Sequence, residues 1–477
     1  MQNKPKHKIN LFTLIMISSA IVVSIRNFPT EAETGLHMIF FALVAAIGFF
    51  VPVALVSAEL ATGWPKQGGI YAWVKEAFGD RLGFVGIWLQ WTYMIIGSIA
   101  MLYFIGGSLA FLFAPSMAHN KYFLFAILMI IVWGATLFSF RGIKASGMVS
   151  TICFLGGVLI PGILIISLGL TYVLKGNPIQ ISMSLDKISL IPDMSRITSL
   201  VILVGFIRAF TGIEVSSSHA NEVTNPTRNY PIAIFVVVIL GFLLNILGSF
   251  SVAAVVPQKH ISLLAGLMQA YHDFFHKFNM GWIVPIVGIM IAVGAIGEIS
   301  TWTLGPVRGI HASAKNGELP PFFQKVNDNG IPTHLLIVQA SFISLVGGGL
   351  LFMPNLNTSF WMSNVLAVLI YIVMYSLMLL AGIRLRYKKA DAARKYRIPG
   401  RKNLGMWAAV LTGLATLTFC FLISFLPPDQ LKITHKTLYV FLLILGFVVL
   451  VSVPFVVYRA RRPAWRIVNS EREESEL

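Results

Sequence analysis

Two arginines and two glutamates interrupt stretches of the chain that are otherwise built for hydrocarbon. Arg26 lies in LFTLIMISSAIVVSIRNFPT, Arg208 and Glu214 lie in LVILVGFIRAFTGIE, and Glu298 lies in a third apolar stretch. A guanidinium group matches a carboxylate through two parallel hydrogen bonds, and a buried carboxylate can bind an ammonium group or carry a proton. The four residues therefore predict a site for a charged ligand, or else two Arg–Glu ion pairs that only neutralise each other.

The composition places these charges in a membrane. The chain has 477 residues, of which 56% are hydrophobic and 12% charged. Apolar windows of about 20 residues recur along it, and each is long enough to cross a hydrocarbon layer of about 30 Å as a helix. Lipid offers backbone N–H and C=O groups no partner, and the windows lack the alternation of barrel strands. We expect an all-α polytopic membrane protein with about twelve spans, at 9–33, 37–62, 83–114, 121–139, 147–174, 197–221, 230–256, 281–311, 333–353, 359–386, 404–426 and 437–459.

Lysine and arginine are distributed unevenly around these spans. An even number of spans puts both chain ends on one side, and that side receives 26 Lys and Arg residues against 8 on the other. The excess marks the cytoplasmic face. We therefore expect a cytoplasmic N-terminus (1–8) and a short cytoplasmic tail (460–477). The net charge of +17 then reflects topology and contact with anionic lipid, not nucleic-acid binding.

The usual markers of other function classes are missing from the sequence. Both cysteines, Cys153 and Cys420, fall within predicted spans, which argues against a disulfide framework or a metal cluster. The chain contains no HExxH, CxxC, GxxxxGK[ST] or GxSxG motif, so it lacks the common signatures of an ATP-driven pump or a hydrolase. We expect neither an enzyme nor a cofactor. Transport driven by gradients fits best, with a channel or a transport-inactive sensor as the alternative of another class.

Two of the predicted spans carry helix-breaking residues. Pro29 lacks a backbone donor and disfavours helix at the preceding residue, which predicts loosening of span 1 around 23–27. Gly205 and Gly212 flank Arg208 in span 6 and mark a second break. Broken helices expose N–H groups that suit a carboxylate and carbonyl groups that suit an ammonium. Glycine and proline also occur in ordinary membrane helices, so the breaks alone leave a structural explanation open.

The two breaks stand five spans apart, which predicts an internal repeat. Secondary transporters with inverted repeats place their substrate site between two such broken helices, at the middle of the membrane. The expected units are a first repeat (9–174), a second repeat (197–386) and two additional spans (404–459). In an unbroken helix, Arg208 and Glu214 would be turned about 240° apart. A break at Gly212 could bring them together.

Five stretches of the chain resemble a known family. They are PVALVSAELAT with GGIYAWVKEAFG, FTGIEVSSSHANEVTNPTRNYP, GEISTWTLGPVRGIHASAKNGELPPFFQKVNDNGIPT, YRIPG and SFLPPD. The chain resembles the amino acid–polyamine–organocation superfamily over roughly residues 8–460, and within it the bacterial glutamate/γ-aminobutyrate antiporter group. The resemblance implies a LeuT-type fold of five plus five inverted spans with two more helices. It also implies a location in a bacterial inner membrane and alternating access around a site between spans 1 and 6, with no sodium site.

Carried over position by position, the resemblance suggests roles for individual residues. It makes 210–214 the break of span 6 and assigns pathway or gating roles to Glu214, Glu298 and Trp302. Glu59, at the cytoplasmic end of span 2, is expected to act as a gate residue. The expected substrate site contains the two arginines and six neighbouring residues. It comprises Arg26, Asn27, Ser98, Arg208, Phe210, Thr211, Gly212 and Ile213.

Two departures from the family pattern concern the substrate. The antiporters carry a Tyr–Glu pair in span 1 where this chain has Arg26 and Asn27, and relatives carry an apolar residue at the position of Arg208. Two added positive charges favour acidic amino acids such as glutamate or aspartate, exchanged or carried with protons. The alternative is a carrier of neutral or unusual amino acids, in which both arginines are structural. The expected partners are small amino acids, protons and membrane lipid, with the protein a monomer or homodimer.

Overall fold

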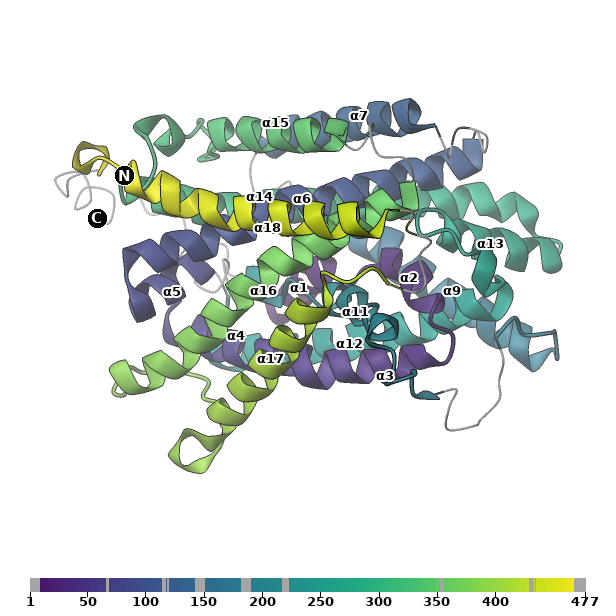
Figure 1. Cartoon of the computed structure of the whole chain (residues 1–477), viewed down its shortest axis with the longest axis horizontal. Helices are drawn as coiled ribbons and strands as arrows, with labels where there is room; N and C mark the ends of the chain where they lie inside the picture. The colour runs from purple at the N-terminus through teal and green to yellow at the C-terminus, as the bar shows by residue number, and fades with distance from the viewer. Residues whose placement is uncertain are drawn as a thin grey trace.

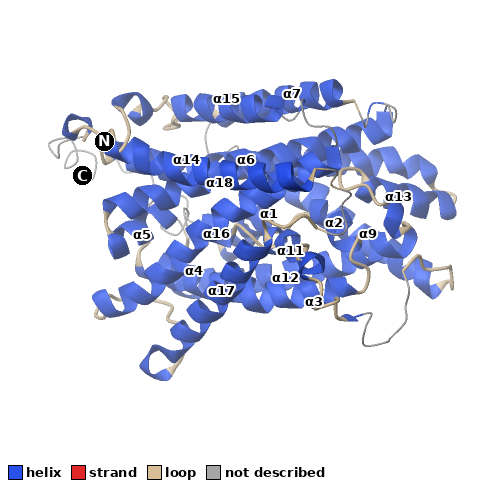
Figure 2. Cartoon of the chain, viewed as in Figure 1, coloured by secondary structure: helices blue, strands red, loops and turns tan. Residues whose placement is uncertain are grey.

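The structure is a computed structural model that describes residues 9–65, 68–113, 117, 120–141, 151–181, 190–216, 223–349, 351, 356–428, 433 and 435–466. The expected N-terminal segment 1–8 and the end of the expected tail, 467–477, lie outside the described residues. Within the described residues the chain is helical (Figure 2), and the only strand-like pairing there is an isolated bridge between Ile9 and Val223.

The membrane helices and their connections follow one another in a simple order. The first half contains α1 (Leu11–Val22), η1 (Ile25–Asn27), α2 (Phe28–Ala32), α3 (His37–Ala45), η2 (Ala46–Phe50), α4 (Val51–Gly63), α5 (Ile70–Phe78), α6 (Asp80–Phe113), α7 (Lys121–Ser139), η4 (Leu155–Leu159) and α9 (Ile160–Leu174). The remainder contains η5 (Ile197–Leu200), α11 (Leu203–Ala209), α12 (Pro226–Val255), η7 (Gln258–His260), α13 (Gly266–Lys277), η8 (Gly281–Ile283), α14 (Val284–Lys315), η9 (Pro321–Gln324), α15 (Thr333–Gly349), α16 (Leu356–Lys388), η11 (Arg401–Asn403), α17 (Leu404–Ile423), α18 (Lys436–Arg459) and η12 (Pro463–Trp465).

Eleven helical segments of the described chain are long and apolar enough to cross a membrane. They coincide with eleven of the expected spans, so the all-α polytopic fold is confirmed. The remaining expected span, 333–353, corresponds to α15, a shorter apolar helix of 17 residues. At 1.5 Å per residue α15 extends about 26 Å, slightly less than a typical hydrocarbon core.

The helices differ in how far they face lipid. In Figure 1, α1, α2 and α11 lie in the middle of the bundle, while α7 and α15 run together along one edge. The most apolar window of α6 is 83% buried and that of α18 only 11%. Because α18 is also strongly apolar, its exposed side chains suit contact with lipid tails. The short and broken elements are therefore enclosed, and long unbroken helices surround them.

Span 1 is interrupted where the sequence predicts it. Helix α1 ends at Val22, and Ser24 has the extended angles φ −140° and ψ 125°. The chain then forms the 3₁₀ turn η1 and the short helix α2, with Pro29 in its first turn. Proline fits that position because a first-turn residue has no intrahelical N–H bond to make. Because α1 ends at Val22, carbonyl groups of its last turn lack helical partners at the centre of the protein.

Span 6 is interrupted between α11 and a 3₁₀ segment at 213–216. Gly212 has φ +111°, a conformation that side chains disfavour. A Cβ atom there would also lie 2.6 Å from the Trp302 ring. The Gly212 N–H, freed from the helix, donates to the Tyr375 hydroxyl at 2.8 Å. The break thus needs glycine for both its backbone angle and its close packing.

Candidate functional site

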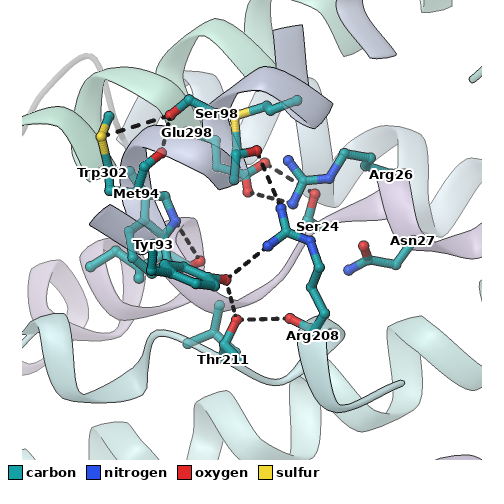
Figure 3. Close-up of a pocket in the computed structure, with 14 residues that line it drawn as sticks. Ser24, Arg26, Asn27, Tyr93, Met94, Ser98, Arg208, Thr211, Glu298 and Trp302 are labelled. Atoms are coloured by element: carbon teal, nitrogen blue, oxygen red, sulfur yellow. Dashed lines mark hydrogen bonds and ion pairs between the residues drawn. The ribbon is translucent and has the colours of Figure 1, made fainter. Parts of the chain in front are cut away.

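The two breaks and two long helices enclose one pocket (Figure 3). The span 1 break, α6, the span 6 break and α14 each contribute polar side chains to it. Its lining consists of Ile21, Val22, Ser24, Arg26, Asn27, Tyr93, Met94, Gly97, Ser98, Met101, Arg208, Thr211, Glu298 and Trp302. The free volume is about 20 Å³, which is room for one or two water molecules. A larger ligand enters this conformation only if side chains or half-helices move.

Arg26 forms an ion pair on one side of the pocket. Its Nη2 lies 3.5 Å from Oε1 of Glu298, and both side chains are largely buried. The Ser24 hydroxyl donates to the other carboxylate oxygen at 3.0 Å. Arg26 Nη1 is also buried, but it has no hydrogen-bond partner within the described part of the chain. Arg26 therefore keeps an unused donor beside the pocket.

Arg208 approaches the same space from α11. Its Nη1 donates to the Tyr93 hydroxyl at 3.1 Å, and its Nη2 donates to the Gly97 carbonyl at 3.3 Å. No Asp or Glu oxygen among the described residues lies within 4.0 Å of the Arg208 guanidinium, although the side chain is only 7% exposed. A buried arginine is normally neutralised by a nearby anion. The positive charge of Arg208 is thus available to a bound anion.

Two aromatic side chains, Tyr93 and Trp302, also border the pocket. The Trp302 indole donates to the Ile21 carbonyl at 3.1 Å, a group that the break of span 1 leaves without a helical partner. The Trp302 ring lies 5.5 Å from that of Tyr93. The Tyr93 hydroxyl is also within 2.6 Å of the Thr211 hydroxyl. Trp302 therefore links α14 to the broken span 1 across one face of the pocket.

The charges around the pocket do not cancel. Arg26 and Arg208 are cationic, and Glu298 is the single acidic side chain in the pocket lining. With Glu298 ionised, the three side chains sum to one positive charge. The site is therefore electrostatically complementary to a ligand with one net negative charge.

The structure brings together five of the eight residues expected to bind substrate. Arg26, Asn27, Ser98, Arg208 and Thr211 line the pocket. The Ser98 hydroxyl donates to the Met94 carbonyl of its own helix at 2.7 Å, so only its acceptor capacity faces a ligand.

The other three expected residues support the break without lining the pocket. Phe210 is fully buried and stacks on Phe50, with 4.9 Å between ring centroids. Ile213 is also fully buried. Gly212 acts through its backbone, which turns the chain away from the pocket. Phe210 and Ile213 therefore belong to the packing around the break.

The sequence allowed a break at Gly212 to bring Arg208 and Glu214 together, but the two side chains do not pair in the structure. Gly212 turns the chain so that Glu214 faces α6 and α16 instead of Arg208. Its Oε1 accepts from Gln90 Nε2 at 2.9 Å and from the Tyr371 hydroxyl, and its Oε2 accepts from the Tyr375 hydroxyl at 2.7 Å. Only one of the two Arg–Glu pairs that the sequence allowed, Arg26–Glu298, is therefore present among the described residues.

Glu59 lies away from the pocket, in a buried cluster at the end of α4. Its carboxylate accepts two hydrogen bonds from Arg386, including one from Nε at 2.8 Å, and a third from the Ile398 N–H at 2.8 Å. Arg394 Nε lies 3.5 Å from the same carboxylate. Through these contacts, Glu59 links span 2 to the end of α16 and to the connection between α16 and α17.

The sequence analysis missed several polar residues that the structure makes prominent. Ser24 and Tyr93 line the pocket, and Tyr371 and Tyr375 bind Glu214. An uncharged polar residue in an apolar stretch carries little signal, so these four could not be singled out. Glu31 differs, because an acidic residue within the predicted span 9–33 is a signal, and the structure buries it.

Comparison with known proteins decides the family. A model of the amino acid permease family matches residues 9–450. The chain belongs to this family. It is 38% identical over 457 residues to a glutamate/γ-aminobutyrate antiporter of Lactococcus lactis, covering 94% of this chain and 90% of that protein. It is 36% identical to an uncharacterized transporter of Legionella pneumophila, in a match that covers 95% of this chain and 97% of that protein. A probable agmatine/putrescine antiporter of Lactococcus lactis is more distant, at 22% identity over 90% of this chain.

Family membership settles the general activity. This permease is a multi-pass transporter of a bacterial membrane and not an enzyme. No group of three or more metal-binding side chains is present in the described ranges.

Proposed function

We propose that this permease carries acidic amino acids, glutamate or aspartate, by alternating access, as an exchanger or together with protons. One observation carries the proposal: two buried arginines converge on a pocket whose lining contains a single acidic side chain. The glutamate/γ-aminobutyrate antiporter at 38% identity supports an acidic amino acid as one substrate.

The side chains around the pocket match the groups of an acidic amino acid. Such a molecule has two carboxylates and one ammonium group, and hence one net negative charge. Arg208 and the free Nη1 of Arg26 supply donors for the carboxylates, with the bidentate geometry that lysine lacks. Glu298 and the carbonyls at the span 1 break accept from the ammonium group. A cationic amine would meet one excess positive charge and bind poorly.

The proposed site also contains its gates. Trp302 bonds to the broken segment of span 1 and would close one side of the pocket after substrate enters. Glu214, bound by Gln90, Tyr371 and Tyr375, holds the span 6 break against α6 and α16. Movement at either break changes both these contacts and the pocket. Substrate binding and helix movement are therefore coupled through the same short segments.

The proposed architecture is the inverted repeat of residues 9–174 and 197–386, followed by two further spans at 404–459. The breaks at Val23–Ser24 and at Phe210–Gly212 would then stand at corresponding positions of the two repeats, which supports this proposal. The excess of Lys and Arg supports a cytoplasmic position for both chain ends.

The alternative is a carrier of neutral amino acids in which both arginines are structural. The Arg26–Glu298 pair and the bonds of Arg208 to Tyr93 and Gly97 are the observations in its favour. The two proposals differ in what Arg208 contributes to selectivity.

Transport by purified protein in liposomes tests the proposal. Labelled L-glutamate is offered to vesicles loaded with unlabelled glutamate, aspartate, γ-aminobutyrate, alanine or agmatine. We expect acceleration by internal glutamate or aspartate, which a channel does not show. Arg208→Lys should weaken apparent glutamate affinity by about 10- to 100-fold, because a bidentate charged contact is worth about 1.5 to 3 kcal/mol.

The exposed Arg462 offers a matched control, since Arg462→Ala removes an arginine far from the pocket lining. Unchanged glutamate affinity in Arg208→Lys and Arg208→Ala, with neutral amino acids competing best, would favour the alternative.

A further inference from the structure

Glu31 stands apart from the charged residues of the substrate pocket. It lies on α2, the half of span 1 that follows the break, and is 1% exposed. It does not line the pocket around Arg26 and Arg208. Its Oε2 accepts from the Ser249 hydroxyl of α12 at 2.8 Å. Its Oε1 is buried and has no hydrogen-bond partner in the described part of the chain.

The surroundings of Glu31 contain no compensating charge. No Lys, Arg or His of the described ranges forms an ion pair with it. The elements packed against α2 are η1, α11, α12 and α13. Of their charged or titratable groups, Arg228 and Lys277 are exposed, and the rest have other partners. Arg26 pairs with Glu298, Arg208 bonds to Tyr93, the Tyr271 hydroxyl bonds to the Pro161 carbonyl, Tyr230 contacts Ser216, and His272 contacts both Asp273 and the His276 ring.

A second polar side chain lies next to this contact. Asn245 precedes Ser249 by four residues on α12, so the two share one face of that helix. Asn245 is 1% exposed, and neither its Oδ1 nor its Nδ2 has a partner among the described residues. Asn245 thus lies one helical turn from the residue that bonds to Glu31, within an apolar helix interface.

We propose that Glu31, with Ser249 and Asn245, is a proton-binding site that must be occupied before α2 can close on α12. Burying an ionised carboxylate without a counter-ion costs several kcal/mol, whereas a protonated carboxyl is neutral and gains a donor. The step is a simple acid dissociation: Glu31 releases its proton to water when α2 moves away and binds one before α2 returns.

The geometry links this site to the substrate pocket. Residues 25–32 form one continuous helical segment, from η1 through α2, which carries Arg26 at its start and Glu31 at its end. The Phe28 ring, between them, packs so closely on Gly248 of α12 that a Cβ atom there would overlap it. A displacement of Arg26 by substrate is therefore transmitted to the contact of Glu31 with α12. This link rests on the function proposed above, whereas proton binding by Glu31 does not.

The expected consequence is a specific change in pH dependence. Raising the pH ionises Glu31 in the open state and opposes closure, so exchange by the natural protein should slow at mildly alkaline pH. Glu31→Gln is neutral at every pH, accepts the same Ser249 hydrogen bond and should exchange faster than the natural protein at alkaline pH. A variant that had only lost its fold could not show this gain. Glu31→Asp keeps an acid and should restore the alkaline decline.

Two measurements test the proposal. The first is exchange of labelled L-glutamate in proteoliposomes with the same pH on both sides, for the natural protein, Glu31→Gln and Glu31→Asp. Glu33→Gln is the control, because it removes a neighbouring acid that lies just beyond α2 and is less buried than Glu31. We expect it to keep the natural pH profile. An unchanged alkaline decline in Glu31→Gln would overturn the proposal.

The second measurement needs no substrate. Infrared spectra of the purified protein, recorded as the pH is raised, should contain a protonated carboxyl band that is absent in Glu31→Gln. If that band is identical in both proteins, Glu31 is not protonated and the inference is wrong, whatever the transport result. If Glu31→Gln lacks the band but the natural protein exchanges no acidic amino acid, the result supports proton binding by Glu31 and contradicts the proposed substrate.

Discussion

Arg26 and Glu298 meet across the break of span 1 at 3.5 Å, while Arg208, which enters the same pocket, has no carboxylate within 4.0 Å in the described part of the chain. Two similar charges in one site thus have different environments. Arg26 is partly neutralised before a ligand arrives, and Arg208 is not. This asymmetry favours one net negative charge on the ligand and predicts different effects of replacing each arginine.

Replacing Arg26 should reduce both stability and transport. Arg26→Ala leaves Glu298 buried without its counter-ion, which costs about 3 to 5 kcal/mol. The double variant Arg26→Ala with Glu298→Gln removes both charges and should recover most of the stability, but not the affinity for acidic amino acids. Thermal unfolding in detergent and glutamate uptake measure the two effects separately. Recovery of full affinity in the double variant would contradict substrate binding by Arg26.

Gly212 should tolerate no side chain. Gly212→Ala introduces a Cβ atom 2.6 Å from the Trp302 ring and 2.9 Å from Ile21, at φ +111°. The strain of such a residue costs about 1 to 3 kcal/mol, and we expect folded protein that has lost most of its transport. Gly134→Ala on α7 is the control, because nothing lies within 4 Å of the added atom. Wild-type uptake by Gly212→Ala would show that the packing of this break is not needed.

Glu59 should matter for the connection between α16 and α17 and not for selectivity. Glu59→Gln leaves Arg386 buried with a neutral partner, and we expect a loss of about 3 kcal/mol in stability and faster trypsin cleavage within residues 389–403. Relative affinities for different amino acids should stay unchanged. Glu76→Gln removes one partner of the more exposed Lys389 pair, at 3.2 Å, and should cost less than about 1 kcal/mol.

A pH dependence of stability should come from Glu318, outside the spans. Burial raises its pKa to about 7, against the lowering effect of a hydrogen bond from the Tyr71 hydroxyl at 2.9 Å. The folded protein therefore binds this proton more tightly than the unfolded chain, and the contribution of Glu318 to stability falls as pH rises from about 4.5 to about 7. Thermal unfolding across this range should show a decline that Glu318→Gln lessens. An identical pH profile in the variant would contradict this assignment.

The sequence alone determined the membrane class, most span positions and both helix breaks. These features depend on local chemistry: run length, apolar content, and the backbone limits of Pro29 and freedom of Gly212. It also singled out Arg26 and Arg208, because a charge in an apolar run is visible without knowing its neighbours.

Only the tertiary structure decided how the charged residues are partnered. Pairing depends on the rotation of helices separated by hundreds of residues, and on the direction in which each break turns the chain. That is why Glu298 meets Arg26, why Glu214 meets Tyr371 and Tyr375 instead of Arg208, and why Glu31 is buried beside Ser249 without a counter-ion.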